Sequence, residues 1–248
     1  MRKILFVISL VLGCLLLPEL SIAQNPGNPI ANRGFYRTMN MYGGYVHTAG
    51  LGIYYRRGWR QTGFTNRIMN FELLTLNHPK QFKVALTQRS TQNGYFLNKI
   101  NSVIMLRGSF GFQKTWFDKE VKRGVRVSTF FLFGPSIALA KPVFMNVNFT
   151  DAGLSTEKYA DIVNLSNVQI LEKAPYLIGV SETVPYPGAH VKVALNFEYS
   201  PDDEFIRALE TGATFDVFPK KIPIMANTYN DQFYITLYVA FHFGRRYL

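Results

Sequence analysis

The chain has 248 residues, with 27 Lys and Arg against 16 Asp and Glu, and a formal net charge of +11. Aromatic residues make up 15% and charged residues 17%, which excludes intrinsic disorder, and the single cysteine excludes a disulfide scaffold and a multi-cysteine metal site. Because Phe, Tyr, Val, Ile and Thr are abundant, a soluble all-β domain and a membrane β-barrel remain.

The first segment predicts export. A positively charged start and an apolar run over residues 4–17 precede a small-x-small cleavage site, Ser21–Ala23. This is the organisation of a secretory signal peptide, so we expect residues 1–23 to be removed and residues 24–248 to form one mature domain. The apolar run is shorter than the ~20 residues that a membrane-spanning helix needs. Cys14 lies in a weak lipobox-like context, so a lipoprotein is the alternative.

Four stretches in the first half of the mature chain alternate with a period of two, which is typical of β-strands with two different faces. Their apolar faces are Ala49, Leu51, Ile53 and Tyr55; Met69, Phe71 and Leu73; Ile104, Leu106, Phe110 and Phe112; and Val125, Val127, Thr129, Phe131 and Phe133. The opposite faces mix charged residues with glycine, as the narrow lumen of a barrel does. Residues 77–101 lack alternation and are expected to form a loop.

The second half begins with another stretch without alternation, residues 148–188, in which Lys158–Ile170 could hold a short helix. Three further strands follow. Their apolar faces are Val191, Val193, Leu195, Phe197 and Tyr199; Leu209, Ala213, Phe215 and Val217; and Phe233, Ile235, Leu237, Val239, Phe241 and Phe243. Five prolines are expected to mark strand breaks or edges: Pro135, Pro142, Pro175, Pro185 and Pro187.

The pattern predicts an all-β fold, an antiparallel transmembrane β-barrel with long loops. Single-chain bacterial barrels have an even number of strands, so the seven visible strands require at least one more. We expect it in Tyr176–Val184 or Phe82–Gln88. Eight strands are the first choice and ten the second, and a soluble sandwich, which also alternates, is the alternative fold.

The predicted inward faces carry a balanced set of charges. The eight residues are Arg56, Glu72, Arg107, Arg126, Lys192, Glu198, Glu210 and Asp216. One interpretation is a charged pore or a carboxylate pair for acid–base chemistry. The favoured interpretation is a salt-bridge network that fills the barrel, because the interior of eight strands is just wide enough for side chains and unpaired buried charge is costly. This predicts that the protein is not a diffusion porin.

The histidines do not indicate a metal or catalytic site. His47, His78, His190 and His242 show no HExxH or HxxxH spacing, and no GxSxG motif occurs. His242 is expected to face the lumen, away from lipid. We therefore expect no catalytic residue, no cofactor and no metal. The alternative is an enzyme that modifies lipopolysaccharide or phospholipid at the membrane surface.

Basic and aromatic residues near the strand ends suggest contact with a membrane surface. The basic groups include Arg57 and Arg60 beside Trp59, Lys220 and Lys221, and Arg245 and Arg246. Anionic lipid headgroups, including lipopolysaccharide, are the expected partners of an exported barrel, and nucleic acid is not; plain solvated turns are the alternative. An interfacial aromatic girdle is predicted from Tyr54, Tyr55, Trp59, Trp116 and Phe117.

Two further segments are candidate interaction sites. The loop before the last strand contains Ile222, Pro223, Ile224 and Met225, which either fold over the barrel mouth or form a docking patch for another envelope protein. Phe241, Phe243 and Tyr247 in the last strand are the expected signal for assembly into the outer membrane.

The C-terminal FHFGRRYL and its alternating strand resemble the terminal strands of small Gram-negative outer-membrane β-barrels. The strings HTAGLGIYYRRG (47–58), NHPKQFK (77–83), LNFEYS (195–200) and KIPIMA (221–226) together resemble an uncharacterised family of such proteins, over most of the mature chain. The sorting signal of these barrels usually ends in Phe, whereas this chain ends in Leu248. The resemblance implies a cell outer membrane location but no activity. We expect a non-enzymatic structural or accessory subunit of a cell-envelope assembly or export complex.

Overall fold

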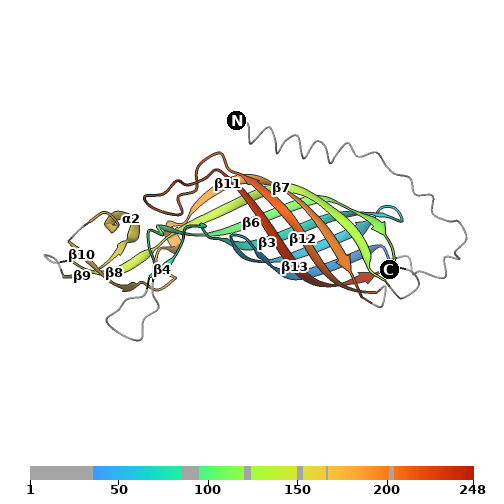
Figure 1. Ribbon diagram of the computed structural model, residues 1–248, viewed down its shortest axis with the longest axis horizontal. Coiled ribbons are helices and arrows are strands. Elements are labelled where there is room, and N and C mark those ends of the chain that lie inside the picture. Colours follow the sequence, from blue (N-terminus) through green and yellow to red (C-terminus); the bar gives the residue numbers. More distant parts are fainter. Residues whose placement is uncertain (1–35, 85–94, 120–123, 150–152, 166, 201–203) are drawn as a thin grey trace, which may run out of the picture. The chain divides into compact units, whose positions relative to one another are not determined.

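The computed structural model describes residues 36–84, 95–119, 124–149, 153–165, 167–200 and 204–248. The predicted signal peptide lies outside the described residues. Eight antiparallel strands close into a barrel, with successive strands side by side and the first paired to the last (Figure 1). They are β1 (Thr38–His47), β2 (Gly50–Arg60), β3 (Thr65–Leu76), β6 (Asn101–Phe117), β7 (Arg126–Pro142), β11 (Val184–Glu198), β12 (Phe205–Val217) and β13 (Phe233–Tyr247). The prediction of an eight-stranded barrel is confirmed.

The strand that the pattern missed is β1, and the expected location was wrong. In Phe82–Gln88 the described residues hold only β4 (Lys83–Val84), which pairs with β5 (Tyr95–Phe96) outside the barrel. Tyr176–Val184 forms a turn and the 3-10 helix η1 (Val180–Glu182), and only its last residue begins β11.

The reason that β1 escapes detection is the polarity of its faces. Its inward positions Met39, Met41 and Tyr45 are apolar and buried, whereas its outward positions include Asn40 and Gly44. The contrast between the two faces is therefore weak or inverted over most of the strand. Its identity as a strand depends on pairing with β2 on one side and β13 on the other.

The faces predicted for the other seven strands agree with the structure. Leu237 on β13, for example, is 59% exposed, whereas its neighbour Thr236 is 3% exposed. Large apolar side chains are exposed on the outer face of every barrel strand. They include Tyr42, Val46, Leu51, Ile53, Phe71, Leu73, Phe110, Phe112, Phe133, Ile137, Val193, Leu195, Leu209, Phe215, Ile235 and Val239. An apolar belt therefore surrounds the barrel.

The five prolines agree with the expectation that they mark strand breaks or edges: Pro142 ends β7, Pro175 follows β10, and the three prolines inside strands lie at a free edge or at a gap in the ladder. Pro185 and Pro187 lie on the part of β11 that pairs with β7 only, because pairing with β12 begins at Ala189. That free edge needs no backbone donor. Pro135 lies in β7, where the ladder with β6 passes from Ser136 to Phe133 without a pair at the proline.

The two ends of the barrel differ in the length of their connections. The end that holds Thr38 and Tyr247 has mostly short turns, whereas the opposite end, called here the loop end, carries the long β3–β6, β7–β11 and β12–β13 connections. Among the described residues no helix is long and apolar enough to cross a membrane.

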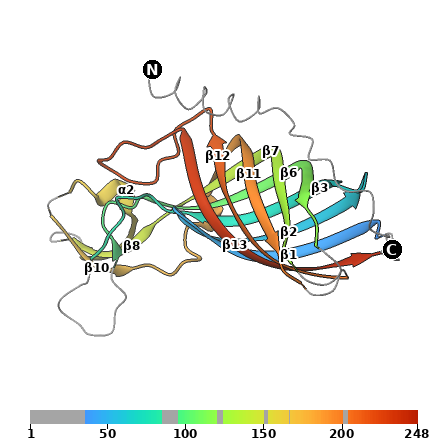
Figure 2. The same cartoon turned by 45° about the vertical axis from the view of Figure 1, so that its right-hand side comes forward.

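A second sheet lies at the loop end (Figure 2). It consists of β8 (Phe144–Phe149), β9 (Gly153–Lys158) and β10 (Val168–Lys173), and the helix α2 (Tyr159–Ile162) follows β9 directly. The expected short helix within Lys158–Ile170 is thus confirmed. The sheet has a small core of its own, formed by Val143, Met145, Val147, Tyr159 and Ile162.

Candidate functional site

The centre of the barrel is filled by ion pairs between side chains that are at most 1% exposed. Arg56 Nη1 lies 2.6 Å from Glu210 Oε2, and Arg56 Nη2 donates to Glu210 Oε1 at 3.1 Å. Arg107 Nη2 lies 2.5 Å from Asp216 Oδ2, and Arg107 Nη1 lies 3.2 Å from Glu72. Six of the eight charged residues predicted to face the lumen thus meet in this central network, the sixth being Lys192, whose Nζ lies 2.5 Å from Glu72 Oε1.

Neutral and aromatic groups complete the coordination of these charges. Tyr238 Oη donates to Glu210 at 2.7 Å, and Tyr45 Oη donates to Glu72 at 3.0 Å. Lys192 Nζ lies 4.2 Å from the centre of the Tyr238 ring. The guanidinium carbon of Arg56 lies 4.1 Å from the centre of the buried Phe130 ring. Charges removed from water need such additional partners, because ion pairing alone rarely repays their desolvation. The network therefore has the composition expected of side chains that fill the barrel and stabilise it.

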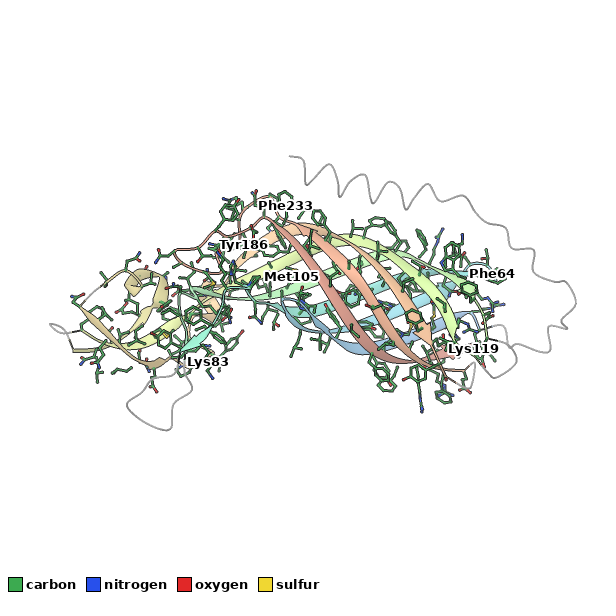
Figure 3. The ribbon with its side chains drawn as sticks, in the orientation of Figure 1. Phe64, Lys83, Met105, Lys119, Tyr186 and Phe233 are labelled. Carbon is green, nitrogen blue, oxygen red and sulfur yellow. The ribbon has the colours of Figure 1, made fainter. Side chains whose placement is uncertain are left out.

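The two remaining predicted charges meet near the end of the barrel that holds Thr38 and Tyr247. Glu198 lies 3.3 Å from Arg126, and it also pairs with Lys119 at 3.1 Å and Arg246 at 2.5 Å. The last two cations were not predicted to point inward. Lys119 follows the end of β6, and Figure 3 shows it at the opposite end from Met105. Lys119 lies outside the regular strands, where alternation assigns no face, whereas Arg246 shares the inward face of β13 with Thr236 and His242, so alternation extended to the end of that strand could have found it.

The loop end of the lumen is closed by apolar side chains, which corrects one interpretation of the 222–225 loop. Ile222, Ile224 and Met225 are 0%, 1% and 3% exposed and belong to the same hydrophobic cluster as Met105 of β6. They are therefore buried and cannot form an exposed docking patch.

Specific hydrogen bonds hold this loop over the mouth. Asn101 Nδ2 donates to the carbonyl oxygen of Pro223 at 2.6 Å. Asn230 Oδ1 accepts from the backbone N–H groups of Ile224 and Met225 at 2.9 and 3.2 Å. The loop therefore folds over the mouth of the barrel, which is one of the two interpretations of its sequence.

The histidines of the barrel are buried. His190 Nε2 lies 2.9 Å from Ser109 Oγ, and His242 Nδ1 lies 2.7 Å from Tyr54 Oη. Ser109 is 4% exposed and His190 2%, so a lipid substrate cannot reach this pair without rearrangement of the barrel. No group of three or more His, Cys, Asp or Glu side chains that could hold a metal ion occurs in the described part of the chain.

Aromatic residues form a girdle at the end of the barrel that holds Thr38 and Tyr247. Trp59, Trp116 and Phe117 lie at strand ends, as predicted, and this girdle also includes Tyr199, Phe205 and Tyr247. Tyr54 was wrongly assigned to it, because this side chain points into the lumen, and Tyr55 is exposed in the middle of β2. Basic groups cover two of the rings: Lys114 Nζ lies 4.4 Å from Trp116, and Arg57 lies 5.6 Å from Trp59.

The residues of the predicted assembly signal all lie on the outer face of β13. Phe241 and Phe243 pack edge to face with ring centroids 4.7 Å apart, and Tyr247 ends the strand. Their role in assembly stays a prediction.

No protein-family model and no curated protein matches the chain, so the resemblance to one family also stays a prediction. Solved structures with a similar fold include Ail, the attachment invasion locus protein of Yersinia pestis, with 9% identity and a TM-score of 0.44 over 86% of this chain and 99% of that chain. Neisserial surface protein A has 7% identity and a TM-score of 0.42 over 86% and 96%. The N-terminal β-barrel domain of Pseudomonas aeruginosa OprF has 6% identity and a TM-score of 0.35 over 84% and 98%. We draw no functional conclusion from matches at these values.

Proposed function

We propose that the protein is an integral outer-membrane β-barrel that does not conduct solutes and serves as a structural or accessory subunit of the cell envelope. The observation that carries this proposal is the apolar belt, which covers the outer face of all eight strands. A water-soluble barrel would have to expose this belt to solvent, whereas hydrocarbon accommodates it without cost. The aromatic girdle at the strand ends is consistent with a membrane–water interface on that side.

The closed lumen supports the non-conducting part of the proposal. Ion pairs fill its centre, and Ile222, Ile224 and Met225 close its loop end. Eight strands leave a bore that side chains can fill completely. A filled lumen suits a scaffold, in which partners are contacted outside the barrel.

The loop end is the side on which we place partner binding. Transmembrane barrels have short periplasmic turns and longer extracellular loops, so the β8–β9–β10 sheet and its helix would face outward. Lipids of the outer leaflet and other envelope proteins are the partners available there. Leu154 and Leu177 are 78% and 81% exposed in this region, which suits contact with a membrane or protein.

A lipid-modifying enzyme is the alternative, and the Ser109–His190 hydrogen bond is the observation in its favour. A nucleophile must however reach its substrate, and both side chains are buried inside the lumen. Loss of a lipid-modifying activity in Ser109→Ala, with the barrel still folded, would favour the enzyme over the scaffold.

Fractionation and conductance test the proposal. We expect the mature chain to begin at Gln24, to fractionate with the outer membrane, and to show heat-modifiable mobility on gels. Purified protein in planar bilayers should give no stable conductance steps. Recovery as a soluble periplasmic protein would contradict the membrane location, and large stable steps would contradict the closed lumen.

A further inference from the structure

Three lysines from three different segments of the chain lie together at the loop end. Lys99 precedes β6, Lys141 is the second-to-last residue of β7, and Lys173 ends β10. Lys99 and Lys141 are each only 8% exposed, while Lys173 is exposed. Asn101, just after Lys99, pairs with Pro142, and Lys173 pairs with Met145, so backbone pairing brings the three lysines to one region, called here the lysine cluster. The charge of Lys173 acts on both of the others there.

The two buried lysines have neutral partners. Lys99 Nζ donates to Asn77 Oδ1 at 3.2 Å and lies 5.1 Å from the centre of the Phe96 ring. Lys141 Nζ donates to the carbonyl oxygen of Pro142 at 3.3 Å and lies 4.5 Å from the Tyr176 ring. Among the described residues no carboxylate forms an ion pair with either lysine. Each ammonium group therefore keeps donors available for a ligand.

This arrangement is unlike the rest of the protein, in which the described buried cations of the lumen meet carboxylates. Burial and the neighbouring charge of Lys173 lower the pKa of Lys99 to about 8. Two buried cations without a counter-ion destabilise a fold unless an anion joins them. An anionic group at this position would supply the missing counter-charge.

An exposed apolar turn lies directly beside the lysine cluster. Leu177, Ile178 and Val180 are 81%, 39% and 49% exposed, and they follow Tyr176, whose ring contacts Lys141. The 3-10 helix of this turn packs beside β7. The turn continues into Val184, which is 49% exposed and pairs with Ala140, so the apolar surface joins the outer belt of the barrel.

We propose that the lysine cluster binds the phosphate group of an outer-leaflet lipid, with an acyl chain of the same lipid lying against Leu177, Ile178 and Val180. The cation cluster supplies charge-assisted hydrogen bonds to phosphate oxygens, and the apolar turn supplies the surface that a free phosphate ion would not need. Charge and apolar surface occur side by side, as the headgroup and the acyl chain do in one lipid. This inference rests on the proposed outer-membrane location with the loop end outward.

The test is binding of lipid A to the full mature protein in detergent micelles, followed by native mass spectrometry and thermophoresis. The probes are lipid A with its phosphates, chemically dephosphorylated lipid A, and inorganic phosphate. The test variant replaces Lys99, Lys141 and Lys173 by Gln. The control variant replaces Lys80, Lys220 and Lys221 by Gln, three exposed lysines from connections at the same end, so the net charge changes equally.

We expect phosphorylated lipid A to bind the test variant about 100-fold more weakly than wild type, because each lysine that donates a hydrogen bond to the phosphate contributes roughly a factor of five. The control variant should lose much less, and dephosphorylated lipid A should bind wild type weakly. Leu177→Gln should weaken binding of lipid A but leave any binding of inorganic phosphate unchanged. Equal losses in the test and control variants would overturn the site in favour of general charge.

Two further results separate the possible failures. Inorganic phosphate that binds as tightly as lipid A would overturn the lipid as the ligand and identify a free anion instead. Lys99→Met keeps the length of the side chain and removes its charge, so it should not lower the urea midpoint of the lipid-free protein while it weakens lipid A binding. A large loss of stability without a loss of binding would overturn the inference. A protein that folds in the outer membrane but binds no lipid A refutes this inference alone.

Discussion

Removal of one carboxylate from the centre of the barrel tests the closed lumen most directly. Glu210→Gln preserves size and leaves one acceptor oxygen, but it leaves the Arg56 guanidinium, which is 0% exposed, without its closest counter-charge. Arg56 then keeps only neutral groups such as Asn70 Oδ1, which accepts from its Nε at 3.3 Å. Because Lys192 Nζ is 3.9 Å from the same carboxylate, a second cation also loses compensation.

The expected loss is about 3–5 kcal/mol of the free energy of unfolding, the usual effect of breaking a buried ion pair by removal of one partner. Coulomb's law agrees in order of magnitude, since two unit charges ~4 Å apart interact by ~4 kcal/mol at an effective dielectric constant of ~20. Urea unfolding of the barrel in detergent micelles, followed by the fluorescence of Trp59 and Trp116, measures this loss.

Two variants serve as controls. Glu182→Gln removes the partner of Lys158 in a pair whose side chains are 43% and 41% exposed, so it should cost less than about 1 kcal/mol. Arg56→Met in the Glu210→Gln background removes the orphaned charge and should restore much of the stability, because replacement of a whole buried pair by apolar groups is often close to neutral. If Glu210→Gln costs no more than Glu182→Gln, water reaches Arg56, the lumen is open, and the reasoning for a non-conducting barrel fails.

Three further predictions concern the lipid face, the strand packing and the lysine cluster. Leu237→Arg places a charge on the lipid face near the bilayer midplane and should destabilise the folded barrel by about 2–4 kcal/mol. Heat-modifiable gel mobility reports the folded barrel, and Thr236→Arg, on the lumen face, is the control. Normal mobility of Leu237→Arg together with lost mobility of Thr236→Arg would show that the two faces were assigned the wrong way round. Gly111→Ala should impair folding in the same assay, because its Cβ would lie 2.0 Å from the backbone oxygen of Phe131, whereas Gly108→Ala, with no neighbour closer than 3.8 Å, should fold normally. Binding of phosphorylated lipid A should weaken as the pH rises from about 7 to about 9.5. Burial and the charge of Lys173 lower the pKa of Lys99 to about 8, so Lys99 loses its charge over this range, while the phosphate is already largely dianionic. An affinity that stays constant over this range would contradict the prediction.

The face assignment of seven strands was determined by the sequence alone. Lipid and lumen impose opposite polarities on alternate residues, and the period of two is a local property that needs no knowledge of neighbours. Six apolar residues on one face of β13 therefore predicted its orientation. The same rule failed at β1, where Met39 and Met41 point inward and Asn40 points outward.

Only the tertiary structure decided which charges meet. Arg56 and Glu210 are 154 residues apart, and they become partners because the closed strand order and register bring β2 and β12 to the same level of the lumen. Burial of the 222–225 loop and assembly of the lysine cluster depend likewise on connections that carry no periodic signal. Alternation predicts on which face of a strand a residue lies. Which residues it meets across the lumen, or in another loop, depends on how the barrel closes and how the loops pack, and long-range contacts decide both.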